Sequence, residues 1–345
     1  MTTSRRVSII VPCRNERGRI AAFAASALAQ KLPAGWTLEI VVADGMSDDG
    51  TSEELAEIAA LDPRVTYVDN QELIVSTGLN SALLVATGEV VVRMDVHTEY
   101  ARDYVAQCLI ALAATGADNV GGPWHAVADP DGGPTQAAVA AAFQSPWVAG
   151  GAISRRLDYD GPADTVYLGA WPRATFDRFG PFDEDLVRNQ DDEHNLRIAR
   201  GGGRIWQSSR IRSRYRPRAS LSQVFRQYLQ YGYWKPFVMK KHGQPAQLRH
   251  LVPAAFVVAL GGSTINAIVG IGAGPLSVLV ASYALVLAAM SVAVLRPAPQ
   301  PLAVAWRVPV VIAAYHVAYG IGTLVGAFDA LSGRPPRERF STLTR

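Results

Sequence analysis

Cysteine, acidic charge and polar residues are each scarce in particular parts of this 345-residue chain. Its two cysteines, Cys13 and Cys108, cannot supply a disulfide framework or a four-ligand zinc site, so we expect a reducing compartment. The opening residues, MTTSRR, run directly into an apolar segment without a signal-peptide core. The N-terminal part is therefore expected to stay in the cytoplasm.

Charge is distributed very unevenly along the sequence. Residues 1–199 hold 15 basic and 28 acidic side chains, whereas residues 200–250 hold 12 Lys and Arg and no Asp or Glu. Residues 251–330 contain only three charged side chains, Arg296, Arg307 and Asp329. This distribution excludes an evenly charged soluble globule, and it also excludes a disordered chain.

Short apolar runs alternate with helix-like stretches in the first hundred residues. The runs are VSIIVP at 7–12, LEIVVA at 38–43 and EVVVRM at 89–94. Continuous apolar strands are typical of a mainly parallel sheet that helices cover on both faces. Ligands bind such sheets beyond the carboxyl ends of the strands, and each of these runs is followed there by polar residues.

Three apolar segments follow near the end of the chain, at about 251–270, 275–295 and 308–328. Each approaches the ~20 residues that span a bilayer. The alternative, a buried helical core, is disfavoured because three such runs follow one another. The first segment is rich in glycine, which makes it the weakest candidate for a span.

The loop at 44–51, DGMSDDGT, is the first candidate site. Asp44 ends a predicted strand, where a carboxylate can accept hydrogen bonds from ribose hydroxyls or from a base N–H. The alternative for Ser47, Asp48, Asp49 and Thr51 is that they only cap the following helix.

Two further clusters carry side chains suited to catalysis. Asp95 and His97 lie two residues apart where the third strand ends, so both can approach one divalent ion. The alternative is a turn with a solvent-facing histidine. Asp191 to Glu193 precede a helix, and a carboxylate beside others has a raised pKa that suits a general base. The alternative there is helix capping together with a Glu193–Arg197 pair.

Taken in order, these segments resemble the family-2 glycosyltransferases with a GT-A fold, most closely those of the succinoglycan-biosynthesis type. The matching pieces are VSIIVPCRNE at 7–16, VVADGMSDDGT at 41–51, GLNSALLVATGEVVVRMDVH at 78–97, GAWPRATFDRFGPFDE at 169–184 and RNQDDEHNLRI at 188–198. The resemblance implies an α/β fold: a Rossmann-like, mainly parallel catalytic domain followed by a helical transmembrane region. The expected divisions are 1–215 for the GT-A domain, 216–250 for a basic aromatic membrane-interface segment, 251–330 for two or three transmembrane helices and 331–345 for a basic tail.

The resemblance also implies roles for individual residues. Asp191 would deprotonate the acceptor hydroxyl in a single displacement with inversion, and Asp95 would be the carboxylate for the metal and diphosphate. The remaining donor-binding residues would be Pro12, Asn15, Glu16, Asp44 and Arg173, with Gln190 and Asp192 on the acceptor side. The alternative for Arg173 is that it is an ordinary surface arginine.

Two departures from the family pattern concern the metal and the acceptor. The usual D-x-D is D-x-H here, so His97 replaces the second carboxylate. Imidazole is a good ligand for Mn²⁺, and the expected cofactor is Mn²⁺ or Mg²⁺. The usual Glu-Asp before the base helix is Gln190-Asp191, and Gln190 can hydrogen-bond an acceptor hydroxyl but cannot take its proton.

The basic stretch at 200–250 contains interleaved Tyr, Trp and Phe, which fits a segment on an anionic cytoplasmic leaflet. A nucleic-acid partner is not expected, because the patch leads directly into membrane segments. The expected partners are a nucleotide-diphosphate sugar, a polyprenyl-linked saccharide and membrane lipids. We expect a multi-pass protein of the cytoplasmic membrane whose catalytic domain faces the cytoplasm.

Topology leaves one conflict and two rival functions open. Three spans would place the basic stretch and the tail RPPRER at 334–339 on opposite sides, although positive charge favours the cytoplasm for both. Either the first segment is re-entrant or the tail is an exception.

The rival functions are a non-catalytic nucleotide-sugar-binding scaffold of a polysaccharide assembly complex and, less favoured, a processive polysaccharide synthase.

Overall fold

A computed structural model describes residues 5–243, 247–297 and 300–335, which form two compact units. Unit 1 comprises residues up to His125 together with Ile153–Tyr215, and unit 2 comprises Ala126–Ala152 together with the chain from Arg216 onward. Residues 126–152 thus cluster with the C-terminal helices, although the sequence places them within the range 1–215.

Unit 1 is built on one mixed sheet with the strand order β3-β2-β1-β4-β8-β6-β9-β7. The strands are β1 (Arg5–Cys13), β2 (Trp36–Asp44), β3 (Val65–Asp69), β4 (Val90–Arg93), β6 (Asn119–Gly122), β7 (Gly161–Pro162), β8 (Tyr167–Pro172) and β9 (Ile205–Gln207). A separate two-stranded sheet joins β5 (Thr98–Tyr100) to β10 (Ser213–Tyr215). The three strands predicted from the apolar runs are β1, β2 and β4, and the predicted parallel pairing of β1 with both neighbours is confirmed.

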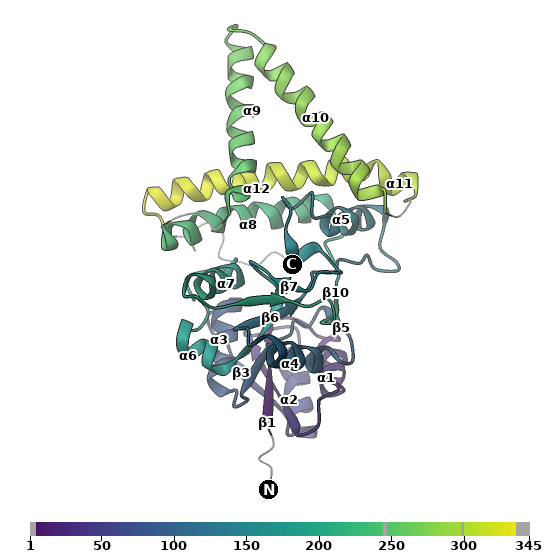
Figure 1. Cartoon of the computed structure of the whole chain (residues 1–345), viewed down its shortest axis with the longest axis vertical. Coiled ribbons are helices and arrows are strands. Elements are labelled where there is room, and N and C mark those ends of the chain that lie inside the picture. The colour runs from purple at the N-terminus through teal and green to yellow at the C-terminus, as the bar shows by residue number, and fades with distance from the viewer. Residues whose placement is uncertain (1–4, 244–246, 298–299, 336–345) are drawn as a thin grey trace. The chain divides into compact units, whose positions relative to one another are not determined.

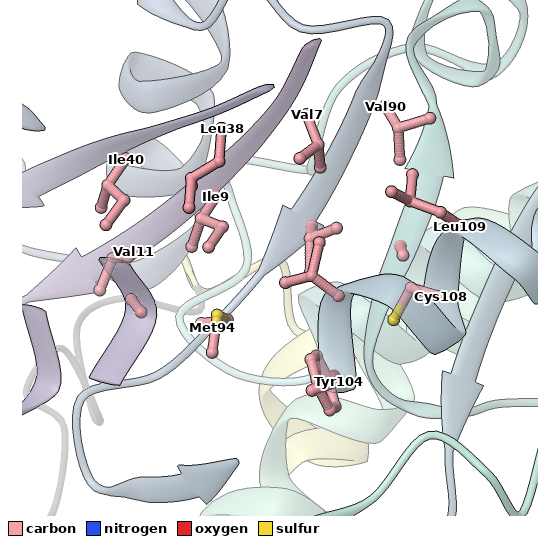
Figure 2. Close-up of a cluster of buried hydrophobic side chains, with 14 of the residues drawn as sticks. Val7, Ile9, Val11, Leu38, Ile40, Val90, Met94, Tyr104, Cys108 and Leu109 are labelled. Atoms are coloured by element: carbon pink, nitrogen blue, oxygen red, sulfur yellow. The ribbon is translucent and has the colours of Figure 1, made fainter. Parts of the chain in front are cut away.

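The helices of unit 1 connect these strands in the order expected for an α/β fold. They are α1 (Ile20–Leu28), α2 (Thr51–Leu61), α3 (Val75–Val85), α4 (Tyr104–Thr115), α6 (Arg173–Phe179) and α7 (Gln190–Arg200), with the 3-10 turn η1 at Ile153–Arg155. Buried apolar side chains cover both faces of the sheet. Figure 2 shows the cluster in which Val7, Ile9 and Val11 of β1 lie beside Leu38 and Ile40 of β2 and near Tyr104 and Cys108 of α4.

The strand order positions a ligand site. From β1 the chain continues on one side to β2 and β3, and it returns on the other side of β1 with β4. The change of direction falls between β1 and β4, and open α/β sheets bind ligands at the carboxyl edge of such a switch point. Cys13 pairs in register with Asp44, and Arg93 pairs with Ile10, so these strand ends share that edge.

Unit 2 contains α5 (Pro134–Gln144), α8 (Leu221–His242), the turn η2 (Leu248–His250), α9 (Val252–Ile268), α10 (Gly274–Leu295), α11 (Leu302–Ala305) and α12 (Arg307–Leu331). Three stretches are long and apolar enough to cross a membrane: Leu248–Ile268, Gly274–Leu295 and Leu302–Leu331. Their burial within the protein differs, at 6%, 0% and 44% of the most apolar window. Figure 1 shows α9 and α10 extending away from α12, which runs alongside α8.

Backbone contact between α8 and α12 explains the burial of the last stretch. A Cβ atom on Gly232 would lie 2.2 Å from the Tyr319 carbonyl oxygen, and one on Gly322 would lie 2.1 Å from that of Leu229. Only glycine permits this approach, because a real Cβ atom never lies so close to a carbonyl oxygen. The backbones of α8 and α12 therefore pack directly against each other at these glycines.

Candidate active site

Two loops at the carboxyl edge are bound to each other by Asn15. Its φ of 53° lies in the left-handed region, which asparagine tolerates better than most residues. The backbone N–H of Asn15 donates to Ser47 Oγ at 2.8 Å, and Asn15 Oδ1 accepts from the Asp48 N–H at 3.0 Å. The loop after β1 is thereby fixed against the loop after β2, with Pro12 half-buried at the end of β1.

Asp44 is a nearly buried carboxylate, 3% exposed, at the last position of β2. Its oxygens accept hydrogen bonds from Ser47 Oγ and Ser52 Oγ, both at 2.5 Å. Hydroxyl donors can rotate away, so this carboxylate can accept from a ligand N–H or O–H without a change in the backbone. The structure places Asp44 at the predicted end of a strand, and its role toward a ligand stays a prediction.

Further along this loop, Asp49 holds the backbone at the start of α2, whereas Ser47 bonds to Asp44 and to the Asn15 N–H and does not cap the helix. Asp49 Oδ1 accepts from the backbone N–H of Thr51 at 3.1 Å and from its hydroxyl at 2.5 Å. Thr51 Oγ1 in turn accepts from the Glu16 N–H at 2.8 Å. Asp49 and Thr51 therefore begin α2 and fix the loop that carries Glu16, which is itself buried.

Asp95 and His97 lie in the turn between β4 and β5. Asp95 is half-buried and His97 is exposed. Arg93 holds the Asp95 carboxylate with two donors, Nε to Oδ1 at 3.0 Å and Nη2 to Oδ2 at 3.2 Å. The Tyr100 hydroxyl accepts from the Asp95 N–H at 2.6 Å and fixes the backbone of the turn.

The donor set of this turn fits a divalent ion that arrives with a phosphate group. Among the described residues, no group of three or more His, Cys, Asp or Glu side chains could hold a metal ion. Asp95 and His97 offer one oxygen and one nitrogen ligand. Mg²⁺ at phosphate-transfer sites is held by one or two carboxylates together with substrate phosphates and water, and Mn²⁺ accepts oxygen ligands of the same kind.

Asp191 lies in the first turn of α7, after Asn189 with its left-handed φ of 63°. Burial and the neighbouring charge of Asp192 raise the pKa of Asp191, and the positive charge of Arg93 opposes this rise without cancelling it. A carboxylate with a raised pKa binds a proton more readily and is suited to general base catalysis. Gln190, one residue earlier, is buried at the same helix end.

The rest of α7 anchors the helix. Glu193 is fully buried and pairs with Arg197 at 2.7 Å, so the predicted i,i+4 pair is confirmed. Asn119 of β6 donates through Nδ2 to Asn195 Oδ1 at 2.7 Å. His194 packs against Phe176 and Phe182, and burial together with the charge of Arg197 lowers its pKa to about 4. These contacts fix Asp191 relative to the sheet.

Arg173 does not join this site, which corrects the expectation that it binds the donor. Its neighbour Pro172 pairs in register with Val90, at the amino end of β4 and thus at the opposite edge of the sheet from Asp95. The guanidinium donates to the carbonyl oxygens of Gly88 at 2.8 Å and of Ala86. Arg173 therefore stabilises the connection between α3 and β4.

Sequence reasoning missed Arg93 and an aromatic pair beside the turn. Trp124 stacks on Tyr167 with ring centroids 4.9 Å apart, and the Tyr167 hydroxyl lies 2.8 Å from Thr98 Oγ1, next to His97. The signal for Arg93 was present in the sequence, because it is a charged residue inside a strand that otherwise reads as buried. The aromatic pair had no such signal, since its members are 43 residues apart.

Comparison with known proteins agrees with this geometry. The pattern of glycosyl transferase family 2 matches residues 8–162. The succinoglycan biosynthesis protein ExoA of Rhizobium meliloti (strain 1021) is 34% identical over 259 residues, which cover 73% of this chain and 76% of that protein.

Two solved structures share the fold at low sequence identity. The mannosyltransferase PcManGT from Pyrobaculum calidifontis, in complex with GDP-Man and Mn²⁺, has a TM-score of 0.61 at 22% identity and covers 92% of this chain and 87% of its own. TarS 1-349 of S. aureus has a TM-score of 0.50 at 14% identity, with 95% and 92% covered. Together with the relative of 34% identity, the sheet order and the family pattern lead to one conclusion: this chain belongs to glycosyltransferase family 2.

Proposed function

We propose that the protein transfers a sugar from a nucleoside-diphosphate donor to a hydroxyl of a lipid-linked saccharide, with inversion at the anomeric carbon, in polysaccharide biosynthesis. What supports this proposal is that Asp44 and Asp95 follow strands that end at the switch-point edge, and that Asp191, whose pKa is raised, lies close enough to Arg93 for the two charges to interact. The relative ExoA, named for succinoglycan biosynthesis, supports the polysaccharide. The apolar helices of unit 2 support an acceptor that resides in the membrane.

The donor nucleotide occupies the loops after β1 and β2. Asp44 accepts hydrogen bonds from the ribose or the base, in exchange for those of Ser47 and Ser52. Pro12, Asn15 and Glu16 form the adjoining wall of this pocket. The likeness to PcManGT, which was solved with GDP-Man and Mn²⁺, supports a nucleotide sugar as the donor.

The diphosphate lies at the turn that carries Asp95 and His97. These two residues would hold Mn²⁺ or Mg²⁺ together with diphosphate oxygens. Such an ion, when bound, neutralises the charge that develops on the leaving diphosphate. Asp95 is already oriented for this role by the fork from Arg93 and by the Tyr100 contact to its backbone.

Asp191 is the general base. Its carboxylate takes the proton of the acceptor hydroxyl as that oxygen forms a bond to the anomeric carbon. The bond from that carbon to the diphosphate breaks on the opposite face, which inverts the configuration. Gln190 and Asp192 lie beside the base and would orient the acceptor, and holding both substrates in one cleft supplies much of the acceleration.

Within unit 2, we assign two membrane crossings to α9 and α10. Their apolar faces are almost wholly uncovered by protein, whereas α12 lies along α8, a helix that carries Arg226, Lys235 and Lys240. A charged helix belongs at the membrane surface, and α12 cannot cross the bilayer while it is locked to such a helix. The α8–α12 layer therefore lies in the interfacial plane.

Two crossings resolve the conflict in topology. The chain enters the membrane through α9 and returns through α10, so the basic stretch at 200–250 and the residues after α12 lie on one side. That side is the cytoplasmic one, with unit 1, because positive charge favours it. The tail at 336–345 lies outside the described residues.

Labelling of single cysteines tests the two-crossing topology. Cys13 and Cys108 are both buried, so they leave a low background. A membrane-impermeant maleimide should label Ile271→Cys, between α9 and α10, only from outside the cell. It should label Lys241→Cys and Ser332→Cys only in inverted vesicles. Labelling of Ser332→Cys from outside would mean that α12 crosses the membrane.

A transfer assay tests the reaction. Membranes containing the protein are incubated with a panel of labelled nucleotide sugars, with Mn²⁺ or a chelator, and with Asp191→Asn beside the wild type. We expect metal-dependent label in the lipid fraction that is lost in Asp191→Asn. If no donor gives transfer although nucleotide binds and a lipid acceptor is supplied, the catalytic proposal fails and the scaffold interpretation replaces it.

A further inference from the structure

Arg93 is a buried cation at the carboxyl end of β4, which is an inner strand of the sheet. It ends β4, where its three predecessors are buried valines, and it is only 6% exposed. Removing a guanidinium from water costs several kcal/mol unless nearby charges and hydrogen bonds compensate. An arginine at such a position therefore requires an acidic environment, and the active site supplies one.

The hydrogen bonds of Arg93 are divided unequally. Nε and Nη2 form the fork on Asp95, while Nη1 is buried and has no hydrogen-bond partner in the structure. A bidentate fork fixes the plane of a carboxylate as well as its distance, which a lysine cannot do. Arg93 thus determines how the Asp95 carboxylate is oriented, and its Nη1 group remains available to donate a hydrogen bond.

The charge of Arg93 also reaches the proposed base. Its positive charge opposes the rise in the pKa of Asp191, and the charges of Asp95 and Asp191 outweigh burial to raise the pKa of Arg93. Arginine remains protonated at every working pH. Asp95 on the donor side and Asp191 on the acceptor side therefore both interact with the permanent charge of Arg93.

We propose that Arg93 is a positioning residue that serves both ends of the active site: its fork orients Asp95 toward the diphosphate, and its fixed positive charge acts on Asp191 as well. This inference rests on the proposed function. At the turn that carries Asp95, the charge of Arg93 offsets that of the carboxylate. Diphosphate binding then depends on a protein cation as well as on any bound ion.

Binding measurements with Arg93→Met, Arg93→Lys and the wild type test this proposal. The probes are GDP and UDP in the presence of chelator, and Mn²⁺ alone. Loss of a nearby positive charge should weaken nucleoside-diphosphate binding about tenfold and strengthen Mn²⁺ binding in Arg93→Met. Arg93→Lys keeps the charge but not the fork, so it should retain most of the metal-free nucleotide affinity and lose turnover.

The pH profile of transfer provides a second readout. Asp191 is influenced by Asp192 on its own helix and by Arg93 on β4, so removal of Arg93 should move the acidic limb of the profile to higher pH. Arg204→Met is the matched control. Arg204 is in the same unit and donates to the Thr115 carbonyl, and its position beside the start of β6 is at the opposite edge of the sheet.

The outcomes separate this inference from the proposed function. Opposite shifts in nucleotide and Mn²⁺ affinity in Arg93→Met, absent from Arg204→Met, would support it. If the wild type binds nucleotide and Arg93→Met leaves both affinities and the pH profile unchanged, then Arg93 is only a structural ion pair and the inference is wrong. If the wild type itself neither binds nucleotide nor transfers sugar, the proposed function fails.

Discussion

The two edges of the sheet in unit 1 use the same kinds of charged side chain for different purposes. At the amino edge, Glu39 accepts from the Ser8 hydroxyl at 2.6 Å and from the Thr87 N–H at 2.6 Å, and Arg173 donates to loop carbonyls. At the carboxyl edge, Asp191 is held with a raised pKa and Arg93 keeps an unused donor. A charge whose hydrogen bonds go to its own loops stabilises the fold, whereas a charge kept partly uncompensated is available to a substrate.

The strongest test of this comparison is Asp191→Asn. Loss of the proposed base should lower transfer by about 10²- to 10⁴-fold while nucleoside-diphosphate binding stays within about twofold of the wild type. Comparable losses of turnover and of nucleotide affinity would instead indicate disruption of the donor pocket. The assay is sugar transfer at saturating donor, with binding measured in parallel.

The same variant should not destabilise the fold. The pKa of Asp191 is raised above its ordinary value of 3.8, so ionisation costs stability, and this cost appears as the pH rises through the folded-state pKa. Asparagine resembles the neutral acid and avoids the cost. Asp191→Asn should therefore melt at a higher temperature than the wild type at neutral pH, and the difference should disappear below about pH 4. A lower melting temperature at neutral pH would contradict the raised pKa of Asp191.

Asp44→Ala should weaken nucleotide binding with a smaller effect than the base variant has on transfer. Loss of hydrogen bonds to a charged acceptor corresponds to about 10- to 100-fold in the Kd of GDP or UDP. Asp49→Ala is the matched control in the same loop, because the Asp49 carboxylate accepts from Thr51 and from the Arg17 N–H, so its loss should change stability more than affinity. Equal affinity losses in the two variants would mean that the loop acts as one structural unit.

Arg173→Met probes the amino edge. It leaves the carbonyl groups of Ala86 and Gly88 without their donor, which should lower the free energy of unfolding by about 1–3 kcal/mol. Transfer per folded molecule should not change. A specific loss of donor affinity, with stability intact, would return Arg173 to the donor site.

The smallest effect is expected for Glu39→Gln, also at the amino edge. Burial alone would raise the pKa of Glu39, but hydrogen bonds from Ser8 and Thr87 and the charge of Arg6 outweigh burial and hold the pKa below 4.5. The ionised form therefore contributes stability above the ordinary pKa, and this contribution is lost as the pH falls through the lowered value. After screening by water, the variant should cost about 0.5–1 kcal/mol at neutral pH and nothing in acid. A cost that stays constant with pH would exclude the electrostatic explanation.

Much of the carboxyl edge could be predicted because it follows from strand ends. Asp44 and Asp95 each stand directly after an apolar run, and parallel strands bring such positions together without any knowledge of side-chain packing. Asp191 could be placed on a helix from its acidic cluster. Its relation to Asp95 depended on the resemblance, because nearly a hundred residues separate the two.

Positions that depend on antiparallel pairing or on helix packing could not be predicted. Arg173 follows β8, and only the antiparallel register with β4 places it at the amino edge. The apolar run that forms α12 has the composition of a membrane span, and its contact with α8 depends on glycines that match each other only in three dimensions. Length and composition indicate that a helix could span a membrane, but they do not indicate which other helix it packs against.

The connection of α7 to β6 has a consequence for how this protein can change. The proposed donor-binding residues all lie before residue 98, whereas the proposed base is carried by a helix that is tied to β6 through Asn119 and Asn195. The two proposed binding regions therefore belong to separate stretches of chain, which are coupled through the charge of Arg93 and through hydrogen bonds such as those from Ser76 Oγ to the Leu186 carbonyl and from Asn80 Nδ2 to the Phe182 carbonyl. Substitutions that alter the choice of nucleotide without touching these contacts should leave the acceptor side in place.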